Sequence, residues 1–284
     1  MYRDVRSAIY SIDKRNTMTN SNRFTLAMRC LVAATLVAAM PSAQSQERDE
    51  PKTTVSGDVK SGKTKALEAG AKLLQSKAPM RGFDIYLVGF HPMKAHPEMQ
   101  MEAHHYCHQV NEDFAQCVLF DGNTAKANMN GMEYIISEKL FGTLPEGERE
   151  YWHPHNGEIL SGQLVAPGIP KVAEKSLMKK KMNSYGKTWH VWNTGMEGHA
   201  GDKLPLGGAE LAWSFNRDGE ALPGMVEKRD RALGIDSKQA RGERADLTPL
   251  AKPQSGVDDL KGKFGRPTEE IPGVVDSKAG ATPR

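Results

Sequence analysis

The pattern of apolar and polar residues divides the chain into a leader (residues 1–45), a lead-in, a folded domain and a tail. Apolar, aromatic and histidine-rich segments lie between residues 80 and 235, where we predict one domain. Residues 46–79 are polar apart from a stretch of helical composition, which predicts a flexible lead-in with a surface helix. Residues 236–284 mix charges of both signs with proline and glycine, which predicts a mostly disordered tail.

Within the domain, short runs rich in β-branched and aromatic residues predict strands. These runs cover residues 83–91, 104–110, 114–120, 131–137, 158–166 and 188–192. Apolar residues at three- and four-residue spacings predict a helix over 170–186, and Thr143 begins a second, shorter one. We therefore predict an α+β domain with a largely antiparallel sheet and two or more helices packed on it.

The leader has the features of a signal peptide. Arg23 and Arg29 precede an apolar run at residues 30–40, and small residues follow up to Ser45, where we expect cleavage. The run is too short to cross a bilayer, so we expect no transmembrane segment in the mature chain. The formal net charge of the whole chain is +3. Residues 1–45 carry +4, so residues 46–284 carry −1. We therefore expect a secreted or periplasmic protein that does not bind nucleic acid.

Two cysteines, Cys107 and Cys117, remain after the leader. A hairpin turn centred on Glu112 would pair Val110 with Phe114 and would place the two cysteines directly opposite each other. Opposed residues in an antiparallel pair lie about 4.5–5.5 Å apart, which is within the reach of a disulfide. The alternative is a pair of buried thiols that pack as small apolar groups.

Histidines in two places indicate possible metal chemistry. His153 and His155 share one face if they lie on a strand, and a hairpin turn at Asn156-Gly157 would bring Glu158 opposite His155. Two imidazoles and a carboxylate are a ligand set for zinc or iron. Further ligands can come from the first hairpin, which carries His104, His105 and His108. The alternative is that these histidines form hydrogen bonds on a partly polar face of the sheet.

Residues 57–64, GDVKSGKT, match the phosphate-binding loop pattern. That loop must follow a buried strand, and the preceding residues DEPKTTVS are too polar to form one. We therefore interpret the motif as a solvated turn before a surface helix, and expect no cofactor there.

Several ordered blocks carry a resemblance to a known family. They include GFH (89–91), EAHHYCHQVNEDFAQCVLFD (102–121), GMEYIISEKLFGTLPEGEREYWHPH (131–155), SGQLVAPGIPKVAEKSLM (161–178), YGKTWHVW (185–192) and DKLPLG (202–207). Together they resemble the oil body-associated proteins, a family classed as a domain of unknown function. The resemblance implies no catalytic residues, and the leader and charged tail suggest an exported, bacterial-type member.

Two hypotheses about function follow from the sequence. The first is a non-catalytic exported domain that binds a lipid surface or a protein partner. The second is a metalloprotein or metalloenzyme that uses His153, His155 and Glu158 together with His104, His105 or His108. The sequence leaves open whether the protein is an enzyme.

Overall fold

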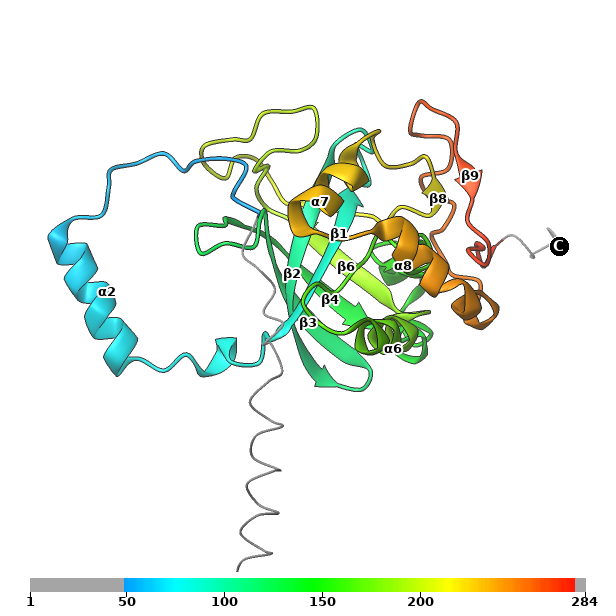
Figure 1. Ribbon diagram of the computed structural model, residues 1–284, viewed down its shortest axis with the longest axis horizontal. Coiled ribbons are helices and arrows are strands. Elements are labelled where there is room, and N and C mark those ends of the chain that lie inside the picture. Colours follow the sequence, from blue (N-terminus) through cyan, green and yellow to red (C-terminus); the bar gives the residue numbers. More distant parts are fainter. Residues whose placement is uncertain (1–48, 279–284) are drawn as a thin grey trace, which may run out of the picture. The chain divides into compact units, whose positions relative to one another are not determined.

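The structure is a computed structural model that describes residues 49–278. The predicted signal peptide lies outside these residues. The described chain forms a seven-stranded antiparallel sheet with several helices, which confirms the predicted α+β class (Figure 1). Its strands are β1 (Ile85–Pro92), β2 (Gln100–Asn111), β3 (Phe114–Phe120), β4 (Met129–Ile136), β5 (His153–Pro154), β6 (Tyr185–His190) and β7 (Glu210–Leu211).

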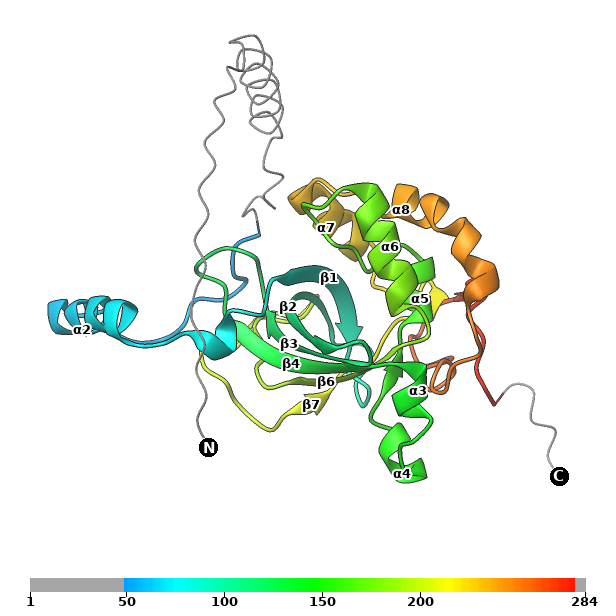
Figure 2. The same ribbon diagram turned by 90° about the horizontal axis from the view of Figure 1, so that it is seen from below.

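The sheet is curled, and its order is β1-β2-β3-β4-β6-β5, with β7 also paired to β6 (Figure 2). The segment around Ala212 connects β6 to the edge strand β1. The Ala212 amide donates to the Thr188 carbonyl of β6, and the Trp213 amide donates to the Pro92 carbonyl of β1. Residues far apart in strand order therefore face one another across the concave side.

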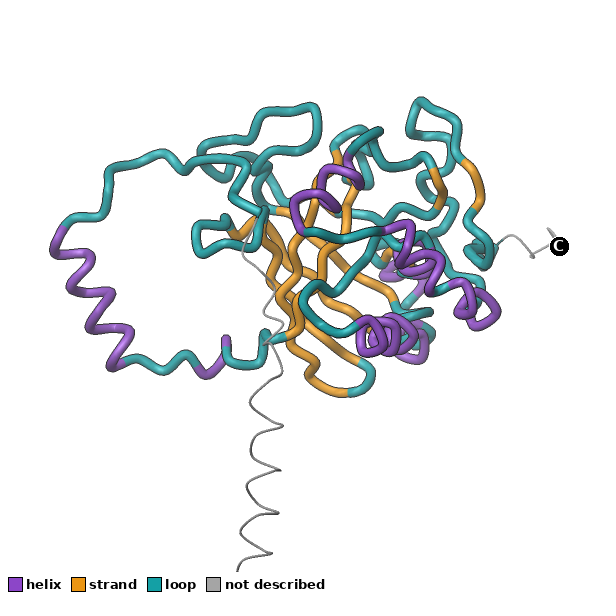
Figure 3. Tube along the Cα trace, viewed as in Figure 1, coloured by secondary structure: helices purple, strands orange, loops and turns teal. Residues whose placement is uncertain are grey.

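The helices of the described chain are α2 (Gly62–Leu74), α3 (Glu138–Phe141), α4 (Glu146–Arg149), α5 (Asn156–Leu160), α6 (Lys171–Lys181), α7 (Met225–Leu233) and α8 (Ser237–Glu243), with short 3₁₀ turns η1 (Ala78–Met80) and η2 (Ala245–Leu250). Four of the helices, α5 to α8, gather on one side of the sheet, whereas α3 and α4 lie on another side and α2 stands apart (Figures 2 and 3). A two-stranded sheet joins β8 (Arg217–Asp218) to β9 (Glu269–Glu270). Helix α6 ends before the predicted Gly186, because Asn183 adopts a left-handed φ of 63° and Gly186 belongs to β6.

The concave face of the sheet holds the main core. Because side chains alternate along a strand, one set of positions on β1 to β4 points inward. At one end these residues are apolar and pack against α5, α6 and the C-terminal segment; they include Leu87, Cys107, Cys117, Leu119, Ile135, Ile159, Leu160, Met178, Val257 and Ile271. The polar residues of the candidate site occupy the rest of this face.

The β2–β3 hairpin confirms the predicted pairing of its cysteines. Cys107 lies opposite Cys117 in the register, and a disulfide joins them. The predicted partner of Phe114 was wrong by one residue: Phe114 pairs with Asn111, because the register shifts between Gln109 and Asn111. The turn is therefore tighter than a symmetric one, while the pairing beyond the bulge is the predicted one.

The strand predicted at residues 158–166 is absent from the described chain, and so is the hairpin turn at Asn156-Gly157. Helix α5 begins at Asn156 instead, and only Val165 bridges to Val88 of β1. The cause is tertiary: the Asn156 amide donates to Gln254 Oε1 and its side chain donates to the Lys252 carbonyl. Contacts with the C-terminal segment thus override the turn preference of the Asn-Gly pair.

We expected a mostly disordered tail, but residues 236–278 are folded onto the domain. Leu260 and Ile271 are each 2% exposed, and Phe264 is 7% exposed. These apolar residues lie in turns and loops without a helical or strand period, which is why the apolar pattern missed them. The segment also supplies the Gln254 side chain that holds the start of α5.

The described residues before helix α2 have no strand, as the polar sequence predicted. Helix α2 then begins with Ser61 as its N-cap. The phosphate-loop pattern therefore lacks the strand that it requires. Among residues 49–278, no helix combines the length and apolar character needed to span a membrane.

Candidate functional site: a buried histidine–glutamate centre

Five histidines and one glutamate meet inside the curl of the sheet. All are at most 3% exposed, and they come from five strands of the sheet (β1, β2, β4, β5 and β6) and from the start of α5: His91, His105, Glu133, His153, His155 and His190. They share the inward-facing set of positions with Leu87, Cys107 and Ile135. The strand alternation that buries the apolar core therefore also buries this cluster.

Glu133 is the centre of the cluster. Its Oε2 lies 2.9 Å from His105 Nε2, and its Oε1 lies 3.2 Å from His155 Nε2 and 3.6 Å from His153 Nε2. Candidate ligand atoms of His91, His105 and Glu133 all lie within 4.8 Å of one another, as do those of Glu133, His153 and His155. Glu133 thus belongs to two overlapping sets of metal-ligand type.

The outer nitrogens of His105 and His155 fix which ring nitrogen carries a proton. His105 Nδ1 lies 3.1 Å from the Ala103 carbonyl, which only accepts, so Nδ1 carries the hydrogen. His155 Nδ1 lies 2.7 Å from Ser184 Oγ, and that hydroxyl donates to the Lys181 carbonyl, so it accepts from His155. In their neutral forms both rings therefore aim an Nε2 lone pair at the Glu133 carboxylate.

Two lone pairs facing a buried carboxylate repel unless a positive charge lies between them. A proton on the imidazoles or a bound cation supplies that charge. A metal-binding histidine usually donates its other ring N–H to a carbonyl, carboxylate or water, which fixes the ring and its tautomer. His105 and His155 show this arrangement through the Ala103 carbonyl and Ser184.

The imidazoles of His91, His153 and His190 are deeply buried and have few hydrogen-bond partners within residues 49–278. Neither nitrogen of His153 has a hydrogen-bond partner among the described residues. His91 Nδ1 lies 3.0 Å from His190 Nε2, so one ring donates to the other. Unpaired buried nitrogens are costly and rare, so His153 calls for a ligand.

Burial keeps three of the imidazoles neutral. It lowers the pKa of His153 to about 3, with the nearby Glu133 charge opposing the change. It also lowers the pKa of His190 to about 4 and that of His91 well below its usual value. Burial raises the pKa of Glu133. Hydrogen bonds from His105 and His155, made when their Nε2 atoms carry protons, lower it by more, so the net pKa lies well below its usual value. Neutral imidazoles around an ionised carboxylate are the forms that bind metal.

Glycines on the inner face make room for the cluster. A Cβ on Gly186 would lie 2.2 Å from Glu133 Oε1 and 2.6 Å from His153 Nε2. A Cβ on Gly131 would lie 2.9 Å from His190 Nδ1. Gly186 is opposite both Ile135 of β4 and His153 of β5, so no larger residue fits beside Glu133 at this point.

Glu158 lines the same small cavity as the cluster but belongs to neither of the two candidate ligand sets around Glu133. The cavity holds about 10 Å³, which is room for about one water molecule, and its lining includes His91, His105, Glu133, His155, Glu158 and Lys181. Burial and the charge of Glu133 raise the pKa of Glu158 well above its usual value. The cavity accepts an ion or a water molecule and has no room for an organic substrate.

The structure separates the predicted ligands into two groups. His153, His155 and His105 converge, with Glu158 nearby. His104 and His108 point to the other face, as strand alternation requires: His104 Nε2 contacts Asp49 and its Nδ1 contacts the Tyr86 hydroxyl, while His108 Nδ1 contacts the Gly82 carbonyl. The Asp49, Glu102 and His104 group already includes the Lys52 cation, 3.5 Å from Glu102.

Sequence reasoning missed His91, Glu133 and His190. A signal for Glu133 was present, because alternation along GMEYIIS places it on the same face as Ile135. A charged residue at an inward position of a strand needs a buried partner. His91 ends an apolar strand in the same way, but its partners depend on the curl of the sheet.

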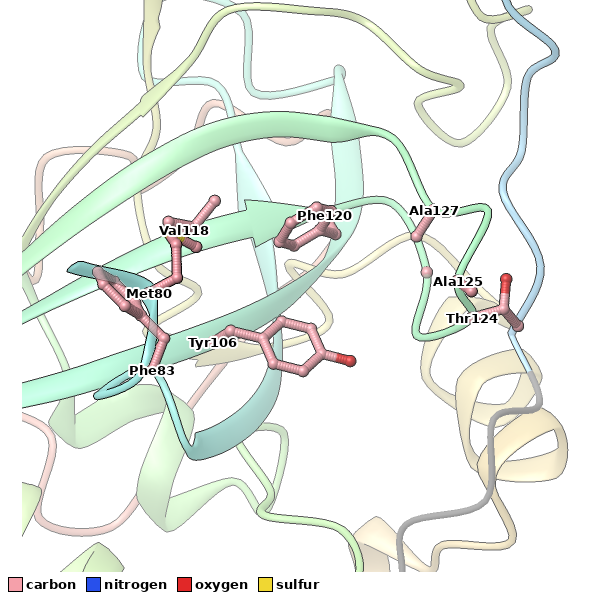
Figure 4. Close-up of a pocket in the computed structure, with 9 residues that line it drawn as sticks. Met80, Phe83, Tyr106, Val118, Phe120, Thr124, Ala125 and Ala127 are labelled. Carbon is pink, nitrogen blue, oxygen red and sulfur yellow. The ribbon is translucent and has the colours of Figure 1, made fainter. Parts of the chain in front are cut away.

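A second, larger cavity is an apolar groove on the outer face of the sheet, with a volume of about 320 Å³. Figure 4 shows the rings of Tyr106 and Phe120 lying between Met80 and Phe83 on one side and the loop of Thr124 to Ala127 on the other. Its lining residues include no carboxylate, imidazole or cationic group. The groove therefore has the character of an apolar contact surface and lacks the ligands of the buried centre.

Comparison with known proteins places the chain in a family. The model of a family described as a protein of unknown function, DUF1264, matches residues 77–248. Oil body-associated protein 1B of Arabidopsis thaliana is 33% identical over 212 residues, covering 75% of this chain and 85% of the relative. The Zea mays protein 1A is 34% identical, covering 77% and 89%. The chain belongs to the DUF1264 family, together with these oil body-associated relatives.

The family match contains every candidate ligand of the buried centre, from His91 to His190. Helix α2 and the folded segment after residue 248 lie outside it. Arabidopsis thaliana oil body-associated protein 2B is 39% identical over 183 residues, covering 64% of this chain and 72% of the relative. No solved structure matches the chain.

Proposed function

We propose that this protein binds one divalent transition-metal ion, zinc or iron, at the centre around Glu133. The observation that carries the proposal is the pair of rings whose Nδ1 protons are fixed outward, so that two Nε2 lone pairs point at one carboxylate. His153, with both nitrogens unpaired, supplies a second imidazole at the same oxygen as His155, so that Glu133, His153 and His155 form one ligand set. His105 faces the other oxygen, Oε2, and orients the carboxylate. Two imidazoles and a carboxylate suit zinc or iron.

The separations between the ligand atoms support one ion. Two ligands that each lie about 2.1 Å from an ion, at about 90–110° to each other, are about 3.0–3.4 Å apart. Glu133 Oε1 lies 3.2 Å from His155 Nε2 and 3.6 Å from His153 Nε2, close to these separations. The set is thus preorganised, and the cavity of about 10 Å³ beside it has room for a metal-bound water. When bound, the ion would supply Lewis acidity or a structural crosslink between β4, β5 and the start of α5.

The test compares two buried glutamates on opposite faces of the sheet. Glu133→Gln removes the charge at the centre. Glu102→Gln removes a charge on the outer face, beside His104; Glu102 is also buried, at 7% exposure. Purified protein and both variants are loaded with Zn²⁺ or Fe²⁺, desalted and analysed for metal. We expect about one equivalent in the wild type and in Glu102→Gln, and less than about a tenth in Glu133→Gln. Wild type without metal, or equal metal in all three, contradicts the proposal.

We also propose that the protein is exported, with cleavage near Ser45, and that it associates peripherally with a lipid surface. The names of the relatives associate those proteins with oil bodies, and α2 carries leucines that are 65–87% exposed. A protein partner is the competing occupant of this apolar surface. Amino-terminal sequencing of the protein from its native host tests the cleavage, and flotation of the protein with lipid vesicles tests the association.

A further inference from the structure

Helix α2 presents an apolar face although none of its thirteen residues is buried. Leu67 is 65% exposed, Leu73 is 85% exposed and Leu74 is 87% exposed. The helix has a defined start, because Ser61 Oγ accepts a hydrogen bond from the Thr64 amide. Exposed leucines on a capped helix need a contact that the described chain does not provide.

The sequence of α2 makes it amphipathic. At 100° per residue, Leu67, Ala71 and Leu74 share one face, and Ala66 and Leu73 flank it. Lys65, Glu68 and Lys72 lie on the opposite face. An apolar stripe opposed by lysines is the pattern of a helix that lies in the plane of a membrane interface.

The charge around α2 indicates what it contacts. Residues 57–77 carry five lysines against Asp58 and Glu68, a net charge of +3, although residues 46–284 together carry −1. Positive charge is therefore concentrated on the segment that exposes the leucines. Lysines next to an apolar stripe attract anionic headgroups, and their long stems let the ammonium groups reach them.

The apolar character continues along the chain from α2 to the domain. Three residues, Gln75 to Lys77, separate α2 from η1, whose Met80 is 56% exposed and lines the outer groove with Phe83 (Figure 4). The connection is short, so a surface that holds α2 also holds the domain close to it.

We infer that α2 is a docking helix for an anionic lipid surface. Its leucine face enters the boundary between headgroups and acyl chains, and its lysines contact the lipid phosphates. The inference rests on the lipid association proposed above and adds to it the element and the charge of the lipid. Because α2 precedes the family match at residue 77, this anchor belongs to the chain's own lead-in.

Hydrogen exchange of the full chain, measured by mass spectrometry with and without vesicles, tests the inference locally. Phosphatidylcholine vesicles are compared with vesicles in which about a quarter of the lipid is phosphatidylglycerol. With the anionic vesicles we expect amides 62–74 to exchange at least about tenfold more slowly, and much less change with the neutral ones. Leu67→Gln with Leu74→Gln should abolish the protection. The control Gly62→Gln with Ala69→Gln changes two exposed positions on the side opposite Leu67 and should keep the protection.

The measured exchange is that of amides 62–74 alone. Membrane binding by other parts of the chain would therefore not slow it. If the protein floats with anionic vesicles while these amides exchange as fast as in solution, lipid association stands and the inference is overturned. If the protein binds no vesicle, both fail. Equal protection on neutral vesicles, or protection that grows with protein concentration without lipid, also overturns it, the latter in favour of a second copy of the chain.

Discussion

His105 Nε2 lies 2.9 Å from Glu133 Oε2, although β3 separates their strands in the sheet. Neither residue is opposite the other in the register, where His105 faces Leu119 and Glu133 faces Cys117. The curl of the sheet brings the two side chains together over the concave face. The same curl brings β5 and the start of α5 to Glu133, and so makes a metal-ligand set from residues that are distant in sequence.

The space at Gly186 should decide whether the centre can form. In Gly186→Ala, the new Cβ would lie 2.2 Å from Glu133 Oε1, so the carboxylate or the strand must shift. We expect retained metal to fall by about tenfold or more and the free energy of unfolding to fall by about 1–3 kcal/mol. Metal analysis and urea unfolding measure the two effects. Gly242→Ala, in α8 with open space around it, should change neither by much.

The Cys107–Cys117 disulfide should stabilise the hairpin that carries His105. For a loop of 10 residues, crosslinking is worth about 2–3 kcal/mol. Reductant should lower the free energy of unfolding by that amount in the wild type and leave Cys107→Ser with Cys117→Ser unchanged. Mass spectrometry after denaturation should find neither cysteine alkylated unless reductant is added, and full alkylation without reductant would show that the thiols are free.

The C-terminal segment should contribute to stability as core. Leu260 is 2% exposed, so Leu260→Ala should cost about 2–4 kcal/mol of unfolding free energy. Val275→Ala, at a residue 45% exposed, should cost less than about 0.5 kcal/mol. Urea denaturation distinguishes the two. A tail that is disordered in solution would make both substitutions neutral.

The outer face should show a pH dependence of its own through His104. Burial lowers the pKa of His104. Hydrogen bonds with Asp49 and Glu102 raise it by more than burial lowers it, so the net pKa lies above its usual value. The folded state then binds the proton more tightly than the unfolded state. The stabilisation is complete below about pH 6.5 and is lost as the pH rises through the raised pKa.

Unfolding of the metal-free protein, followed in urea between about pH 6 and 9, measures this loss. His104→Gln should remove the dependence. His96→Gln should keep it, because His96 is exposed with a side chain 57% accessible. An unchanged slope in His104→Gln would mean that other groups carry the titration.

Local patterns were enough to predict part of this molecule. The alternation around Cys107 places His105 inward and His104 outward, and the short turn fixes the pairing of the cysteines. Both follow from the two-residue period of a strand. The proximity of His153 and His155 also follows from two positions in one short segment.

The rest depends on contacts that no local pattern contains. Glu133 joins the histidines only because the sheet curls, and Asn156 begins a helix only because Gln254 and Lys252 reach it. Glu158, predicted to face His155 across a turn, lies on helix α5 for the same reason. Ile271 belongs to the core although it lies in a loop directly after the two-residue, exposed strand β9.

The metal contents of His105→Ala and His104→Ala test the central claim most directly. The two residues are adjacent on β2 and both buried, at 3% and 0% exposure, but they point to opposite faces. After loading with Zn²⁺ or Fe²⁺ and desalting, with folding checked by circular dichroism, His104→Ala should retain about one equivalent and His105→Ala less than about a tenth. Equal metal in the two folded variants would contradict a metal centre at Glu133.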